Sequence, residues 1–267
     1  MRLRKIIFSI VIPTHKRSVL LARALQSIKA QSQESDIEII VVSDLIDSPT
    51  DSVCNFYLGS DDIYIRRNGV VGPSDSRNLG KSLASGQYIL FLDDDDAWHP
   101  DFLKNLYEGI GSHPNHSLYF NCSVVKETRG PSEPLFISES VLDLQNTLTT
   151  DVYVKNQVHM SCFVFPMTVV RSLSFDSSMR AYEDWDFQLS AYDREFPIHV
   201  PLLGSRVFEV DDVSSDRRGS SQTATDLNAV FDYLYVYRRH PARDDRIKLL
   251  RQQLLATVGL MIDKDLL

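Results

Sequence analysis

Four consecutive aspartates, Asp93–Asp96, directly follow an apolar run of strand length, Tyr88–Leu92. An unbroken apolar run of this kind predicts a strand that is buried on both faces. Because unpaired charge is costly to bury, we expect the four carboxylates where the strand leaves the sheet. Crowded carboxylates repel one another unless a cation joins them, and hard divalent ions prefer oxygen ligands. The alternative is a solvated acidic turn before a helix that has Pro100 in its first turn.

The elements before the acidic run predict a parallel α/β sheet. Strands are expected at 6–12 and 37–42, with a helix between them that has Ser18 as its N-cap, and this βαβ unit has a right-handed crossover. A short strand at 63–65 and a helix from Ser74 to about residue 86 then lead to the acidic strand. Open sheets of this class bind ligands at the carboxyl ends of their strands. The acidic run therefore lies where a ligand is expected.

Beyond the acidic run, strands and helices alternate less regularly. The predicted elements are a helix at 101–110, strands at 117–125 and 161–165, a helix at 181–194, strands at 198–201 and 206–210, and two closing helices at about 227–239 and 243–258. The stretch near 130–140 has the composition of a loop. The segment 214–226 is polar, contains glycine and lacks periodicity, so we expect a mobile loop there.

Composition narrows the class of protein. With 267 residues, 43% hydrophobic and 24% charged, the chain is long enough for one large core with an appendage. Its net charge of -8 argues against general nucleic-acid binding, and no apolar run reaches the length of a transmembrane helix. Cys54, Cys122 and Cys162 have the spacing of neither a zinc site nor a disulfide set, which fits a reducing cytosol.

Four landmarks in order resemble the inverting nucleotide-sugar glycosyltransferases of family 2, which have the GT-A fold. They are FSIVIPTHKR, IEIIVVSD, SDSRNLGKSLASGQYILFLDDDD and YEDWDF, within residues 8–194. Each is weak alone, but the ordered set is specific, and it favours a ligand site over a solvated turn for the acidic run. The resemblance implies a Rossmann-like GT-A fold with a central, mostly parallel sheet flanked by helices, plus a C-terminal helical tail.

The resemblance also implies a division of the chain. A catalytic domain is expected at 1–212, with a nucleotide-binding half at about 1–100 and an acceptor-binding half at about 101–212. The mobile loop and the C-terminal helices follow at 213–267. Acceptor specificity is expected in the part of the chain where the resemblance fades, beyond about residue 200.

Individual residues acquire roles from the same resemblance. Those implied to bind the nucleotide are Pro13, Thr14, Arg17, Asp44, Arg77, Asn78, Asp93 and Asp94. The Asp-x-Asp motif that holds Mn²⁺ or Mg²⁺ falls on Asp93 and Asp95, although four aspartates in a row leave its register ambiguous by one residue. The chain has His15 and Lys16 where the family usually carries an aromatic residue and an asparagine. Asp44 is placed to accept the imide N–H of uracil, a contact that thymine or guanine could also make through an N–H donor. Arg77 has an alternative role as a salt-bridge partner of Asp75.

The catalytic base falls on Asp184, in the Glu-Asp pair. Its competitors are Glu183, which is also a candidate for binding an acceptor hydroxyl, and Asp186, which we expect to face solvent or to cap the helix. A helix turns about 100° per residue, so the three acids cannot all face one acceptor. Further candidates for contact with the acceptor or the diphosphate are Trp185, His159, Arg217 and Arg218.

We therefore expect a metal-dependent inverting glycosyltransferase. It would move a sugar from a nucleotide diphosphate donor, expected to be a UDP-sugar, to a hydroxyl of a saccharide or lipid-linked saccharide. The metal neutralises the leaving diphosphate, and a carboxylate takes the proton of the acceptor hydroxyl. The expected setting is cytoplasmic, peripheral on the inner face of the membrane, in synthesis of a bacterial surface polysaccharide such as lipopolysaccharide or capsule. The oligomeric state stays open.

Two other functions remain as alternatives. A sugar nucleotidyltransferase also has a nucleotide-binding sheet, but it would need a glycine-rich phosphate loop after the first strand, and PTHKRS has no glycine. A non-catalytic metal- or sugar-binding module is the other alternative. The segment DDDDAWHPDFLK is not an EF-hand, because it lacks Gly at the sixth position and Glu at the twelfth.

Overall fold

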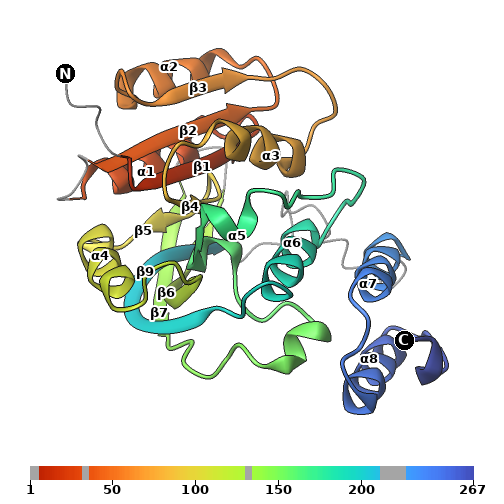
Figure 1. The fold of residues 1–267 in the computed structure, drawn as a ribbon. Helices are drawn as coiled ribbons and strands as arrows, with labels where there is room; N and C mark the ends of the chain where they lie inside the picture. The colour runs from red at the N-terminus through yellow and green to blue at the C-terminus, as the bar shows by residue number, and fades with distance from the viewer. Residues whose placement is uncertain (1–5, 32–35, 130–133, 211–226) are drawn as a thin grey trace.

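The structure of the chain, a computed structural model, describes residues 6–31, 36–129, 134–210 and 227–267. It is a mixed α/β protein in which a curled sheet is flanked by helices (Figure 1). The described strands form one sheet in the order β3-β2-β1-β4-β8-β6-β9-β5, with β7 paired to β6. The expected fold class is thereby confirmed.

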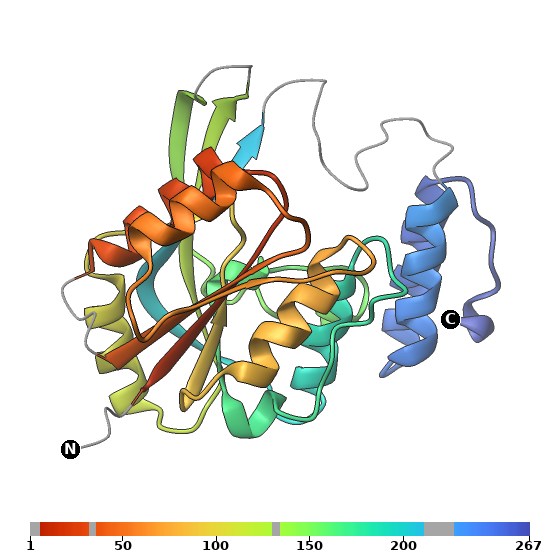
Figure 2. The ribbon, with the colours of Figure 1, turned by 90° about the horizontal axis from the view of Figure 1, so that it is seen from above.

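The first half of the sheet is parallel. It consists of β1 (Phe8–Thr14), β2 (Ile37–Ser43), β3 (Ile63–Arg66) and β4 (Tyr88–Phe91). Every residue of β1, β2 and β4 is buried, which explains why their sequences are continuous rather than alternating. The helices are α1 (Ser18–Lys29), α2 (Ser48–Tyr57) and α3 (Pro73–Leu83). Figure 2 shows α3 on the opposite face of these strands from α1. Because β1, β2 and β4 are parallel, their carboxyl ends meet at one edge of the sheet.

The second half of the sheet is mixed. Its strands are β5 (Ala97–Trp98), β6 (Leu118–Thr128), β7 (Leu135–Leu142), β8 (Phe163–Pro166) and β9 (Ile198–Val210). β8 is antiparallel to both β4 and β6 and so joins the two halves, whereas β9 is parallel to β6. The helices are α4 (Phe102–Ser112), α5 (Met167–Val170) and α6 (Glu183–Tyr192), with 3-10 turns at Thr150–Tyr153 and Met160–Cys162.

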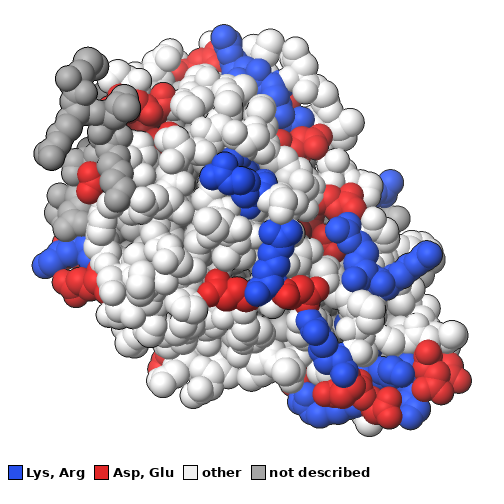
Figure 3. Space-filling model, in the orientation of Figure 1, with Lys and Arg blue, Asp and Glu red and all other residues white. Residues whose placement is uncertain are grey.

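Of the C-terminal helices, α7 (Leu227–Arg239) packs beside α6, whereas α8 (Asp245–Thr257) contacts the 3-10 turn at Thr150–Tyr153 and is followed by a 3-10 turn at Lys264–Leu266 (Figure 1). Arg251 of α8 is fully buried and donates to the carbonyl oxygens of Tyr153 at 2.8 Å and His240 at 2.7 Å. Burial lowers the pKa of Arg251 to about 10. Charged side chains of both signs are interspersed over this part of the face in Figure 3. The buried guanidinium of Arg251 thus holds the C-terminal tail to the rest of the protein through Tyr153. The division into a catalytic domain and a tail stays a prediction.

Several predicted elements differ from the structure. The stretch near 130–140 was expected to be a loop, but β7 (Leu135–Leu142) is a strand; it is exposed on both faces, so its sequence has no alternation to reveal it. The strands expected at 198–201 and 206–210 are one strand, β9, whose register shifts opposite Asn121. Helix α2 was not predicted, because its apolar pattern is weak. The signals for α2 are Pro49 in its first turn and Asp47, whose side chain caps it by accepting from the Thr50 N–H.

Two helix starts were also placed wrongly. Ser18 is the first residue of α1 rather than its N-cap, and the N-cap is Arg17, which makes no side-chain capping bond. Pro100 precedes the N-cap of α4, Asp101, and so does not lie in the first turn. Residues 211–226, which include the whole of the predicted mobile loop at 214–226, lie outside the described residues.

Gly86 lies where the chain passes against β1 just before the acidic strand. A Cβ at this position would lie 2.7 Å from the Ser9 backbone N and 3.0 Å from the Phe8 carbonyl carbon. These are backbone atoms of a central strand and cannot move aside cheaply. We expect Gly86→Ala to lower the free energy of unfolding by about 1 to 3 kcal/mol, measured by urea denaturation.

The matched control is Gly111→Ala on α4, where a Cβ would meet nothing within 4 Å. Alanine favours a helix over glycine by up to about 1 kcal/mol, so this variant should be unchanged or slightly more stable. Equal stability of the two variants would contradict the close approach at Gly86.

Candidate active site

The ends of β1 and β4 bring residues 80 positions apart into contact. Thr14, the last residue of β1, donates through Oγ1 to Oδ2 of Asp94 at 2.7 Å. Arg17, the N-cap of α1, lies 3.2 Å from Asp94 and 3.3 Å from Asp95. Pro13 lies beyond the last β1–β4 pair, Val11 with Phe91, so its missing N–H interrupts no ladder with β4. The first loop and the acidic run are thus parts of one cluster.

The four aspartates do not all lie at the surface. Asp94 and Asp96 are 4% and 2% exposed, whereas Asp93 and Asp95 are only half-buried. Asp96 accepts from Ser161 Oγ at 2.6 Å and from the Phe208 N–H at 3.2 Å. Burial raises the pKa of both Asp94 and Asp96 to about 7, an effect that Arg17 opposes at Asp94. The expectation that none of the four turns inward is wrong, because donors satisfy the two buried carboxyl groups; the solvated-turn alternative fails for the same two residues.

Arg77 joins the acidic run to the start of α6. Its guanidinium lies 2.6 Å from Asp93 Oδ1 and 2.9 Å from Glu183 Oε1, 106 residues away in sequence. Burial opposes the charge of Arg77, but Asp93 and Glu183 outweigh it and raise its pKa. Burial likewise acts on Asp93, yet Arg77 holds the pKa of that carboxyl below its usual value, whereas at Glu183 burial prevails and the pKa is raised. The alternative pairing of Arg77 with Asp75 is wrong, because Asp75 instead lies 3.9 Å from Arg67.

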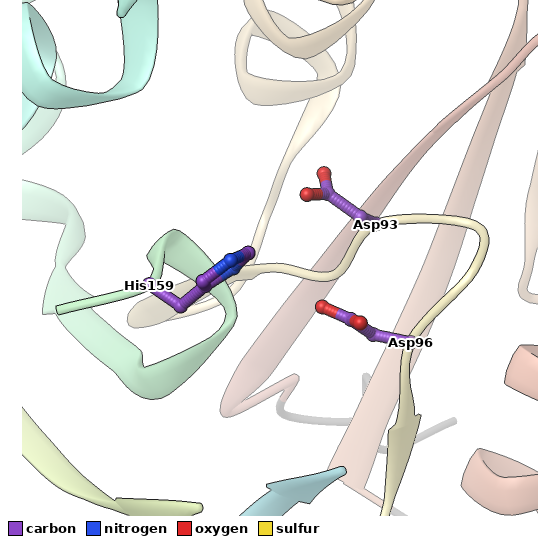
Figure 4. Close-up of side chains that lie close together, drawn as sticks. All are labelled: Asp93, Asp96 and His159. Atoms are coloured by element: carbon purple, nitrogen blue, oxygen red, sulfur yellow. The ribbon is translucent and has the colours of Figure 1, made fainter. Parts of the chain in front are cut away.

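Asp93, Asp96 and His159 form a group that has the ligands of a divalent metal site. One ligand atom from each lies within 4.8 Å of the others, and Figure 4 shows the three side chains converging from the acidic turn and from the segment before β8. Two carboxylate oxygens and an imidazole nitrogen suit Mn²⁺, Mg²⁺ or Zn²⁺. The residues present therefore fit a divalent cation. His159 was expected on the acceptor side, and its only sequence signal is its position just before a predicted strand.

Asp95 lies outside that group. Its carboxylate pairs with Arg17 at 3.3 Å and with Arg129 at 3.1 Å, while its backbone oxygen accepts from Arg23 at 2.6 Å. Arg23 and Arg129 both also contact the buried Glu127. Sequence reasoning missed these two arginines because Asp95, which both contact, lies 72 residues from Arg23 and 34 residues from Arg129 in the chain. The role of Asp95 as a metal ligand stays a prediction.

Asp44, one residue beyond β2, is buried and already engaged. It contacts Nδ1 of His15 at 2.5 Å through one oxygen and accepts from the Gly72 N–H at 2.8 Å through the other. His15, which takes the place of the family's usual aromatic residue, has a side chain that is 39% exposed. The contacts fix the orientation of Asp44 at the same edge as Thr14.

The three acids at the start of α6 have different surroundings. Glu183 is held by Arg77. Asp186 is fully buried and pairs with His240 at 3.0 Å and Arg239 at 3.3 Å, so the expectation that it faces solvent or caps the helix is wrong. Asp184 is half-buried, accepts from the Trp185 N–H at 2.8 Å and from Asn156 at 3.4 Å, and has no ion pair among the described residues. Of the three, Asp184 keeps its carboxylate least occupied.

Two predicted site residues are structural in this arrangement. The side chain of Asn78 forms a pair of hydrogen bonds with the backbone of Phe175, at 2.8 and 2.9 Å. Trp185 is fully buried and donates through Nε1 to the Val152 carbonyl at 2.7 Å, so it cannot contact an acceptor. Arg217 and Arg218 lie outside the described residues.

Comparison with known proteins gives a family for this chain. A family model described as glycosyl transferase family 2 matches residues 9–173, which covers the first three landmarks except Phe8 and leaves YEDWDF beyond it. The GalNAc(5)-diNAcBac-PP-undecaprenol beta-1,3-glucosyltransferase of Campylobacter jejuni is 28% identical over 210 residues, 77% of this chain and 66% of the relative. Succinoglycan biosynthesis protein ExoW of Rhizobium meliloti is 28% identical over 194 residues, 66% of this chain and 60% of the relative. The chain thus spans about two thirds or less of the length of these two relatives.

The fold has a counterpart among solved structures. The crystal structure of S. aureus TarS 1-349 in complex with UDP matches with a TM-score of 0.66 and 16% identity, over 94% of this chain and 71% of that one. The same protein in complex with UDP-GlcNAc matches with a TM-score of 0.66 and 18% identity, over 94% of this chain and 72% of that one. At this identity the likeness shows the fold alone, and that fold is GT-A.

Proposed function

The chain belongs to glycosyl transferase family 2, and from this premise we propose that it transfers a sugar, with inversion, from a nucleotide diphosphate donor to an acceptor hydroxyl. The observation that carries the proposal is the bridge from Asp93 through Arg77 to Glu183. It joins the acidic edge expected to hold the donor diphosphate to the helix that carries the candidate base. The bridge thereby holds the side chains assigned to the sugar donor next to those assigned to the sugar acceptor.

The donor half of the proposal uses the cluster at the ends of β1, β2 and β4. We assign nucleotide binding to Pro13, Thr14, Arg17, Asp44, Arg77, Asp93 and Asp94, whereas the bonds of Asn78 to Phe175 leave it a supporting role. Arg17 supplies a positive charge for the diphosphate, and Asp44 an acceptor for the imide N–H of uracil. That TarS has been solved with UDP and with UDP-GlcNAc supports a UDP-sugar as donor.

A divalent cation, Mn²⁺ or Mg²⁺, would neutralise the charge that develops on the leaving diphosphate. Asp93 belongs both to the ligand set that the resemblance implies, with Asp95, and to the group that lies together, with Asp96 and His159. We therefore assign Asp93 as the common ligand. Arg77 then keeps Asp93 ionised and oriented, because it holds the pKa of that carboxyl low.

The acceptor half of the proposal centres on Asp184. Its carboxylate accepts the proton of the acceptor hydroxyl as that oxygen attacks the anomeric carbon. Glu183 is fixed by Arg77 and is left to contact a second acceptor hydroxyl. Attack opposite the leaving diphosphate in a single displacement inverts the anomeric configuration, so an α-linked donor gives a β-linkage.

The acceptor is proposed to be a saccharide, free or lipid-linked. The name of the Campylobacter jejuni relative refers to an undecaprenol-linked substrate, and that of the Rhizobium meliloti relative to succinoglycan biosynthesis. Within the described ranges, none of the helices is long and apolar enough to cross a bilayer. From the names of these two relatives, the proposal has the protein working peripherally, on the inner face of the cytoplasmic membrane, in assembly of a bacterial surface polysaccharide.

Slow donor hydrolysis tests the function without knowledge of the acceptor. Incubated with Mn²⁺ and a panel of nucleotide sugars, the protein should release nucleoside diphosphate from one of them, measured by chromatography. EDTA should stop the release and added Mn²⁺ restore it. Release of pyrophosphate from a nucleoside triphosphate would instead show a nucleotidyltransferase. No release with any donor or saccharide acceptor would contradict the proposal in favour of a binding module.

A further inference from the structure

The helix that carries the candidate base begins at a residue with an unfavourable backbone conformation. Tyr182, the N-cap of α6, is left-handed, with φ 63° and ψ 16°, and makes no side-chain capping bond. This conformation costs a non-glycine residue on the order of 1 to 2 kcal/mol. It persists only where surrounding contacts impose it. The position of the next two residues, Glu183 and Asp184, therefore depends on what holds the chain just before them.

Those contacts come from α7, in the C-terminal tail. Oδ2 of Asp232 accepts from two consecutive backbone N–H groups, Arg180 at 3.2 Å and Ala181 at 2.9 Å. The neighbouring ring of Tyr233 packs edge-on against Tyr182, with 4.5 Å between ring centroids. A single turn of α7 thus fixes the three residues that immediately precede Glu183.

Other contacts of α7 hold both sides of this point. Tyr235 and Arg239 bind Asp176, in the loop between α5 and α6, at 2.9 and 2.7 Å. Arg239 and, one residue beyond α7, His240 also bind Asp186, one turn into α6. Because α7 contacts the loop before the helix and the helix itself, it sets the place of the first turn of α6 relative to Arg77 and the acidic edge.

We propose that Asp232 is a positioning residue for the transfer reaction: it sets the backbone of 180–182 and through it the placement of Glu183 and Asp184. The inference rests on the proposed function. It gives the C-terminal tail, where the family match no longer extends, a role in the catalytic step. A displacement of about 1 Å at a reacting group can cost about 10² in rate, so loss of this contact should reduce turnover without touching the donor site.

Asp232→Ala tests the proposal by a split between turnover and donor binding. We expect kcat for transfer to fall about 10²-fold, while the Kd for nucleoside diphosphate with Mn²⁺, measured by calorimetry, stays within about twofold of wild type. Asp232→Asn keeps an oxygen that can accept both N–H groups and should recover most of the rate. The control is Asp245→Ala on α8, an acid whose side chain is 81% exposed, which should behave as wild type.

The outcomes separate this inference from the proposed function. If the wild type is active and Asp232→Ala has the same kcat, the positioning role is overturned. It is also overturned if Asp232→Ala loses nucleotide affinity as much as it loses turnover. Absence of turnover in the wild type counts instead against the function. Hydrogen exchange needs no variant: in wild-type protein the amides of Arg180 and Ala181 should be protected relative to the exposed Ser177, and free exchange at both would show that Asp232 does not hold them.

Discussion

Asp93→Asn is expected to lower the transfer rate by about 10³-fold, measured as kcat at saturating donor and Mn²⁺. The substitution keeps the shape of the side chain and removes its charge. That charge serves twice, because Asp93 lies in the Asp-Asp-His group and also pairs with Arg77 at 2.6 Å. Charge stabilisation by a bound metal contributes several kcal/mol, and each ~1.4 kcal/mol is a factor of ten in rate. Binding of Mn²⁺, followed by electron paramagnetic resonance, should weaken in parallel.

Two companion variants distinguish the possible ligand sets. If the metal is held as the family resemblance implies, Asp95→Asn loses Mn²⁺ binding and His159→Gln keeps it. If the metal is held by Asp93, Asp96 and His159, His159→Gln loses Mn²⁺ binding and Asp95→Asn keeps it. His159→Gln is preferable to a change at Asp96, because Asp96 is 2% exposed and its bonds to Ser161 and Phe208 also support the fold. Full activity of the wild type in EDTA, or unchanged Mn²⁺ affinity in Asp93→Asn, would exclude the metal site.

The parallel half of the sheet was predictable because its signals are local. The continuous apolar runs of β1, β2 and β4 correspond to strands buried on both faces, and the spacing of Leu21, Leu25 and Ile28 corresponds to the buried face of α1. Strand order alone then brings Thr14 and the acidic run to one edge. Nothing beyond periodicity and the rules for parallel sheets was needed for that part of the site.

The rest of the site depends on contacts that no local pattern records. The inward turn of Asp94 and Asp96 requires donors from Thr14, Ser161 and Phe208, each from a distant segment. The bridge through Arg77 spans 106 residues, and its glutamate belongs to a helix whose first turn offers three acids. Sequence identifies such residues as candidates, whereas tertiary packing decides which of them meet.

Packing also distinguishes the three acids of α6, and this determines the choice of base. Glu183 is paired with Arg77, and Asp186 is fully buried between Arg239 and His240. Asp184 alone of the three has no ion pair among the described residues, and it lies in the first turn of α6. The helix N-terminus favours an ionised carboxylate there by about 0.3 to 1 kcal/mol. A base must be free to accept a proton, and of the three acids Asp184 has the carboxylate least occupied by other side chains.

Asp184→Asn should therefore lower the transfer rate by about 10² to 10⁴, the usual cost of losing a positioned base. Donor affinity, measured by calorimetry with nucleoside diphosphate and Mn²⁺, should stay close to wild type, because Asp184 does not contact the donor cluster. Glu183→Gln is the matched control: it removes a neighbouring charge that Arg77 already neutralises, so a smaller loss is expected. Asp186→Asn should act mainly on stability, through its buried pair with His240. If Asp184→Asn transfers normally and either Glu183→Gln or Asp186→Asn does not, the base is the acid whose variant is inactive. The acceptor then lies against a different face of α6.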